Sequence, residues 1–182
     1  MKQIMLTTMI LLSFFMPIAI TPSYSSEVFY VDMPSLSKHA FDIVEGEVIA
    51  VECKWYEPHN SIYTYTTIRL EKALKNKVKT EEIILKDIGG KIGDIITSGP
   101  VLVSYTVGEK VLVFLQRDGD YFTTYCRGQG KYRIEMMNGA KVLKKDINLD
   151  ELRLPKGIHM ENIKTQLNYS DLLEEIHNNM NQ

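Results

Sequence analysis

The stretch from Asp42 to Tyr56, DIVEGEVIAVECKWY, decides the predicted fold. Apolar and polar side chains alternate along it with the period of a β-strand, but neither face is uniformly apolar. A bulge near Gly46 would exchange the two faces midway, so that Val44 and Ile49 both point inward. A long strand with a bend inside it can contribute to both halves of a small closed sheet. The stretch therefore predicts the first strand of a β-barrel.

The residues that follow carry further strand and turn signals. Residues 62–74, IYTYTTIRLEKAL, alternate between a face that runs into the core and an outer face with Tyr63 and Tyr65. Residues 110–117, KVLVFLQR, form a continuous apolar run, which is typical of a strand buried on both sides. Hairpin turns are indicated by Asp-Gly and Asn-Gly pairs, at 118–119 and 138–139.

Regularly spaced short strands with turns between them predict a mainly β protein, a five-stranded OB-type barrel with an additional hairpin. A short amphipathic C-terminal helix follows Ser170, where Leu172, Leu173 and Ile176 recur at helical spacing. The predicted organisation is a signal peptide at 1–25, an N-terminal arm at 26–34, the barrel domain at 35–145 and a C-terminal extension with the helix at 146–182.

The signal-peptide prediction rests on an uncharged, mostly apolar run over residues 4–20. Lys2 precedes this run, and small residues at Ser23 and Ser25 precede the expected cleavage site. The alternative is an uncleaved anchor, because seventeen residues come close to a membrane span. Cleavage predicts an exported protein, periplasmic or extracellular, with no remaining membrane attachment.

The charge balance limits the range of possible functions, and the cysteine content bears on the predicted disulfide. The chain has 21 basic and 23 acidic residues, a net charge of −2, which argues against nucleic-acid binding. Its two cysteines, Cys53 and Cys126, would form a disulfide in an oxidising compartment, and the alternative is two buried free thiols.

The motif around Cys126, CRGQGKYR, invites comparison with a thiolate that binds phosphate. Such a loop needs an arginine six residues after the cysteine, and Tyr132 occupies that position. The sequence also lacks HExxH and GxSxG motifs. We therefore expect no catalytic residues, no metal and no cofactor. A hydrolase assembled from distant residues, with His39 or His59 as a metal ligand, is one alternative. A structural cell-envelope component is the other.

Three segments together resemble a known family: FDIVEGEVIAVECKW at 41–55, IYTYTTIRLEKALKNK at 62–77 and GEKVLVFLQRDGDYFTTYCRGQGKYRI at 108–134. Their strand and turn pattern resembles the netrin-like OB-fold domains, to which the tissue inhibitors of metalloproteinases and many exported bacterial proteins belong. The resemblance implies an OB barrel that engages, and in some members inhibits, a protease. The animal inhibitors place an N-terminal cysteine on the protease zinc, whereas this chain has no cysteine before Cys53.

Aromatic residues provide the candidate binding site. Tyr63 and Tyr65 share one strand face, and Trp55 and Tyr56 adjoin the loop at 57–61. OB-type barrels bind ligands on such a face and its flanking loops. We therefore predict a non-enzymatic binding module for a protein partner, with a protease as one candidate. The alternative is that these aromatics only cover the barrel or support the C-terminal helix.

Overall fold

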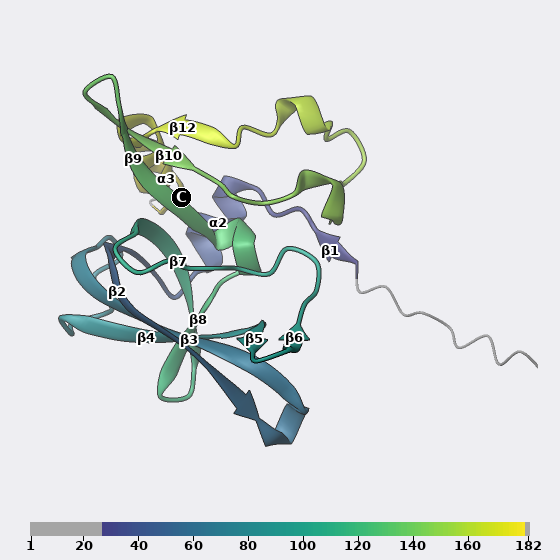
Figure 1. The fold of residues 1–182 in the computed structure, drawn as a ribbon. Coiled ribbons are helices and arrows are strands. Elements are labelled where there is room, and N and C mark those ends of the chain that lie inside the picture. Colours follow the sequence, from purple (N-terminus) through teal and green to yellow (C-terminus); the bar gives the residue numbers. More distant parts are fainter. Residues whose placement is uncertain (1–26, 181–182) are drawn as a thin grey trace, which may run out of the picture.

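Five strands form a ring of paired neighbours in the computed structural model, which describes residues 27–180 (Figure 1). Around the ring lie β2 (Asp42–Tyr56), β3 (Ser61–Ala73), β4 (Glu82–Ile88), β8 (Tyr121–Thr124) and β7 (Lys110–Asp118), which pairs with β2 again. All neighbours are antiparallel except β4 and β8, which meet in parallel at one pair, Leu85 with Phe122. The mainly β prediction is confirmed, and the ring is uneven. The predicted signal peptide lies outside the described residues.

Strand β2 bends as its sequence predicts. Its register with β3 shifts between Glu45 and Gly46 and again between Val48 and Ala50. A Cβ atom on Gly46 would lie 2.4 Å from the carbonyl oxygen of Arg69, so the close approach of β3 requires glycine there. The expectation for Ile49 is not met, because the second shift leaves it half-buried, and Val48 fills the core position instead.

Strand β7 is buried on both faces, as its apolar run predicts. Val111, Val113 and Leu115 pack inside the ring. Leu112 and Phe114 face the other way, into a second core outside the ring. Because both faces of β7 are covered, it joins the two cores of the molecule.

The second core lies between helices and an extension of the sheet. From β7 the sheet continues through β9 (Lys131–Met137), β10 (Ala140–Lys144) and β12 (Gln166–Asn168). Helices α2 (Met33–His39) and α3 (Tyr169–Met180) pack against this extension in Figure 1. The predicted second hairpin and C-terminal helix are confirmed. Tyr169 donates a hydrogen bond to buried Glu45 of β2, which connects α3 to the ring of strands.

Short elements complete the chain. The hairpin of β5 (Gly90–Ile92) and β6 (Ile95–Thr97) packs beside β2 and β3, where the Ile62 N–H donates to Thr97 Oγ1 over 3.0 Å. Strand β1 (Val28–Phe29) pairs in parallel with β11 (Leu152–Arg153). Four short 3₁₀ helices also occur within residues 27–180: η1 (Glu57–His59), η2 (Arg127–Gly130), η3 (Leu149–Glu151) and η4 (Met160–Asn162).

The CRGQGKYR motif bends the chain between β8 and β9 and anchors the N-terminal arm. Cys126 and Arg127 adopt left-handed conformations, with φ of 58° and 57°. The buried Gln129 amide accepts from the Val31 N–H and donates to the Phe29 carbonyl, both over 2.9 Å. The glutamine thereby pairs with the arm as a neighbouring strand would. The motif is an architectural junction.

The predicted disulfide between Cys53 and Cys126 is wrong, because both residues are free thiols. Cys53 lies on β2 within 3.4 Å of Thr64 Oγ1, next to the β5–β6 hairpin. Cys126 instead packs against the second core, outside the ring. The two thiols therefore lie on different sides of the ring of strands.

Candidate functional site

Three of the four predicted binding residues share one surface. In the register of β2 with β3, Tyr56 faces Ser61, Lys54 faces Tyr63 and Glu52 faces Tyr65. Because side chains alternate along a strand, Tyr56, Tyr63 and Tyr65 lie on the same outer face. Trp55 lies on the opposite face, across from the buried Ile62, with 39% of its surface exposed. The structure therefore separates Trp55 from the three tyrosines.

The aromatic–lysine cluster, formed by Tyr56, His59, Tyr63 and Lys86, occupies the end of this outer face. The Tyr56 and Tyr63 rings meet edge to face, with centroids 5.1 Å apart. His59 Nδ1 and the Tyr63 hydroxyl are 2.6 Å apart. Lys86 Nζ, from β4, lies 3.9 Å from the Tyr56 ring centroid and 5.1 Å from that of Tyr63. Hydrogen bonding and cation–π attraction thus hold these side chains in a fixed arrangement.

A second contact group extends the same face along β3. The Tyr65 and Tyr121 rings meet edge to face at 5.5 Å, and Lys54 Nζ lies 5.3 Å from the Tyr65 centroid. Lys54 also pairs with Glu52 over 2.8 Å. Tyr121 and Lys86 are not among the predicted site residues, because their proximity to the tyrosines depends on how β4 and β8 join the ring.

The Tyr63 phenol keeps its proton in these surroundings. Partial burial raises the pKa of Tyr63, although the nearby Lys86 opposes the change. The phenol therefore stays neutral at physiological pH and can both donate and accept a hydrogen bond. The face combines aromatic rings with hydroxyl groups, and tyrosine is enriched in binding hot spots.

One part of the alternative interpretation, that the aromatic residues support the C-terminal helix, is not met by Tyr56, Tyr63 and Tyr65. Helix α3 packs with α2 on the second core, where Tyr169 is its aromatic contact to β2. The outer face with Tyr63 and Tyr65 belongs to the hairpin of β2 and β3 instead. These tyrosines thus remain half-exposed.

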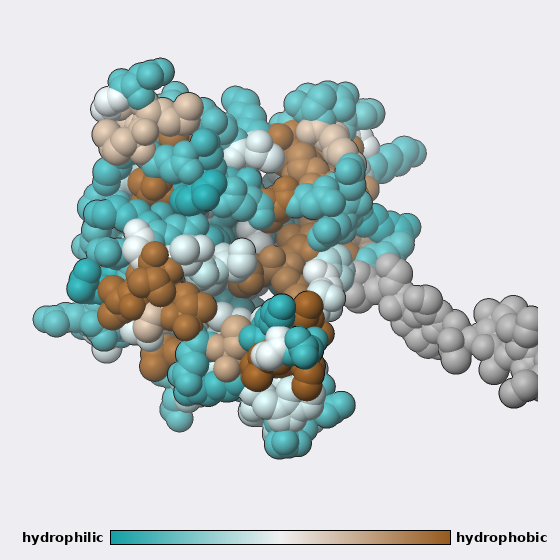
Figure 2. All heavy atoms as spheres, viewed as in Figure 1, coloured by the Kyte–Doolittle hydropathy of each residue, from teal (hydrophilic) through white to brown (hydrophobic). Residues whose placement is uncertain are grey.

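Exposed apolar residues gather nearby on the β5–β6 hairpin. Ile92, Ile95 and Ile96 are 38%, 57% and 62% exposed. Figure 2 shows hydrophobic atoms over this hairpin. Clustered exposed apolar residues frequently mark interaction surfaces.

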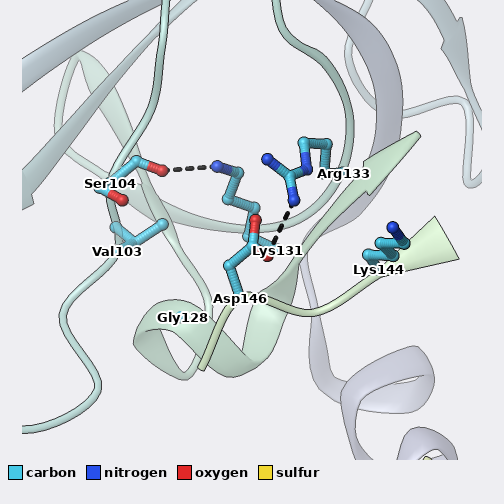
Figure 3. Close-up of a pocket in the computed structure, with 7 residues that line it drawn as sticks. All are labelled: Val103, Ser104, Gly128, Lys131, Arg133, Lys144 and Asp146. Carbon is cyan, nitrogen blue, oxygen red and sulfur yellow. Dashed lines mark hydrogen bonds and ion pairs between the residues drawn. The ribbon is translucent and has the colours of Figure 1, made fainter. Parts of the chain in front are cut away.

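The cations near the CRGQGKYR motif are already engaged. Figure 3 shows Lys131, Arg133, Lys144 and Asp146 around a cavity of about 10 Å³, enough for roughly one water molecule. Lys131 Nζ donates to the Ser104 carbonyl and lies 2.8 Å from both carboxylate oxygens of Glu109. Arg133 pairs with Asp146 over 3.1 Å. This arrangement stabilises the junction and leaves little room for a bound anion.

The described residues offer little for metal chemistry. Within 27–180, no group of three histidine, cysteine, aspartate or glutamate side chains could hold a metal ion. His39 ends α2, whereas His59 lies at the tip of the β2–β3 hairpin, so they belong to different parts of the fold. None of the helices in this part of the chain is long and apolar enough to cross a membrane.

Comparison with known proteins adds no assignment. No protein-family model, no curated protein and no solved structure matches this chain. The geometry of the outer face is therefore the basis for the functional proposal.

Proposed function

We propose that the protein is an exported, non-enzymatic binding module of the OB type, which engages a protein partner through the outer face of β3 and β4. The observation that carries the proposal is the aromatic–lysine cluster, continued along the same face by Tyr65 and Tyr121. A protease is one candidate partner, by the resemblance to netrin-like domains.

The strand order supports an OB-type barrel. Three successive antiparallel strands, β2, β3 and β4, precede a parallel step to β8, and β7 closes the ring back to β2. OB-type barrels bind ligands on their second and third strands and on the loops beside them. The aromatic–lysine cluster occupies the corresponding strands, β3 and β4, and the loop that contains His59.

The composition of the face supports a protein partner. Tyrosine buries a large area at a small cost in side-chain entropy, and interfaces are enriched in it. Lys86 adds positive charge that is compatible with an acidic partner surface. The overall charge of −2 disfavours the alternative of a nucleic acid.

Removal of two tyrosines should abolish partner capture. The double variant Tyr63→Ser and Tyr65→Ser removes the aromatic centre of the face but leaves the barrel core untouched. With the purified protein immobilised, we expect the native form to retain a specific partner from the organism's exported proteins. Since truncating an interface hot spot costs about 2 kcal/mol or more, the double variant should bind that partner at least 30-fold more weakly.

The matched control is Met136→Ser on the β9–β10 hairpin. Met136 is a large apolar residue that is 65% exposed and lies outside the tyrosine face. This variant should retain the partner. If the tyrosine variant and the native protein captured the same partner with equal affinity, the outer face would not be the binding site. If the recovered partner is a protease, its activity with and without this protein tests inhibition directly.

A further inference from the structure

The β2–β3 hairpin extends beyond the core of the barrel, and its inner face borders a second, separate site. Cys53 and Thr64 face each other across the two strands on this inner side. The segment after β6 crosses opposite them, and a pocket of about 360 Å³ lies between. This volume falls within the range of small-molecule sites.

All the described residues around this pocket are uncharged, in a chain in which 24% of residues are charged. Val51, Leu102 and Val103 provide apolar surface. Hydroxyl groups and one thiol provide its polar atoms, among them Thr64, Ser98 and Cys53. A charged ligand would lose its hydration here without gaining an ionic partner, so the lining selects an uncharged one.

The pocket wall is held in place before any ligand arrives. The segment of residues 98–109 has no helix or strand, but neighbouring elements fix it at several points. Arg127 donates to the Pro100 carbonyl over 3.0 Å, and the Gly128 N–H donates to the Val101 carbonyl over 2.9 Å. Behind the pocket, the hydroxyl of buried Tyr105 lies 2.7 Å from Thr124 Oγ1. A preformed wall lowers the entropic cost of binding.

The Cys53 thiol is placed directly beside this space. A Cβ atom on Gly90 would lie 2.7 Å from Cys53 Sγ and 2.7 Å from Thr64 Oγ1. Gly90 has a φ of 131°, which disfavours other residues there. Glycine at this point allows the β5–β6 hairpin to approach the thiol closely. Cys53 is also one of the residues that line the pocket, so the thiol borders the space that a ligand would fill.

We propose that this pocket binds a small, uncharged, largely apolar molecule against the Cys53 thiol. The site is distinct from the outer tyrosine face, because Cys53 and Thr64 point to the opposite side of the same strands. Loss of partner binding through the tyrosines would therefore leave this proposal intact.

The test uses the uncharged fluorophore N-phenyl-1-naphthylamine as the probe. We expect saturable binding of one probe per chain, weakened at least fivefold by Ser98→Arg, which puts a charge at the exposed rim. Leu102→Trp, which fills the pocket, should weaken binding to a similar extent. Ile96→Ser, on the exposed β6 surface, is the control and should change affinity less than twofold. Circular dichroism and thermal unfolding establish that each variant is folded.

A second measurement is the rate at which the Cys53 thiol is alkylated. In a Cys126→Ser background, saturating probe should slow alkylation of Cys53 by iodoacetamide at least fivefold. The anionic analogue 8-anilino-1-naphthalenesulfonate should bind at least fivefold more weakly than the neutral probe. Non-saturable binding, equal affinity for the two fluorophores, or an alkylation rate that the probe does not change would each overturn the proposal. So would unchanged affinity in folded Ser98→Arg protein.

Discussion

Replacement of Asp42 by asparagine is expected to lower the free energy of unfolding by about 4 kcal/mol, because it removes two of the four backbone hydrogen bonds that this buried carboxylate accepts. Asp42 is fully buried at the start of β2. One carboxylate oxygen accepts from the N–H groups of Ile43 and Lys75, and the other accepts from those of Lys77 and Val78.

This carboxylate connects the start of β2 to the turn between β3 and β4. An asparagine of the same size would direct its NH₂ group at two backbone donors, which would lose their acceptor in a buried site. Since domains of this size are stable by about 5–15 kcal/mol, the variant should be marginally folded. Urea unfolding followed by circular dichroism measures the difference.

Asp32→Asn is the matched control for Asp42→Asn. Asp32 caps α2 at the surface by accepting from the Ser35 N–H over 2.9 Å, and asparagine is an equally good N-cap. The control should therefore change stability by less than about 0.5 kcal/mol. A loss below about 1 kcal/mol for Asp42→Asn would show that the turn does not depend on the carboxylate.

Replacement of Asp87 by asparagine should have the opposite effect to Asp42→Asn: at neutral pH it should raise the free energy of unfolding. Burial inside the ring raises the pKa of Asp87 to about 6, despite hydrogen bonds from the Thr124 N–H and hydroxyl, which lower it. Because the folded-state pKa lies above the unfolded value of 3.8, the protonated carboxyl favours folding. That contribution is complete below pH 3.8 and is lost as the pH rises through 6.

An amide at this position mimics the protonated carboxyl at every pH. The free-energy gain of Asp87→Asn over the native protein should therefore grow between pH 4 and pH 7, by up to roughly 3 kcal/mol. Urea unfolding of both proteins at pH 4, 5, 6 and 7 tests this directly. Tyr105→Phe serves as the control, since it removes the hydrogen bond to Thr124 but keeps the carboxyl. A stability difference for Asp87→Asn that is constant from pH 4 to 7 would contradict the assigned role of Asp87.

Periodicity revealed the parts of the fold that depend on hydrophobic burial. The apolar run in β7, the bend near Gly46 and the two hairpins all follow from local sequence. The roles of Asp42 and Asp87 do not, because a lone aspartate carries no sign of the distant N–H groups it binds. Gln129 is similar, since its partners lie about a hundred residues earlier in the chain.

The candidate site was predicted only in part, because local alternation is visible in the sequence and contacts between distant strands are not. Alternation along β3 placed Tyr63 and Tyr65 together, and the hairpin register added Tyr56. Trp55, the direct neighbour of Tyr56, fell on the opposite face because side chains alternate. Lys86 and Tyr121 come from other strands of the ring, so only the topology could bring them to the face. The disulfide prediction failed because the sequence alone does not show on which side of the ring of strands each cysteine lies.

Photo-crosslinking tests the central claim, that the outer face of β3 and β4 binds a protein partner. Benzoylphenylalanine is introduced in place of Tyr65, and in a second protein in place of Met136 on the distant β9–β10 hairpin. Irradiation in the presence of the organism's exported proteins should give one specific adduct from position 65 and none from position 136. An adduct from position 136 alone, or none from either position, would contradict the account.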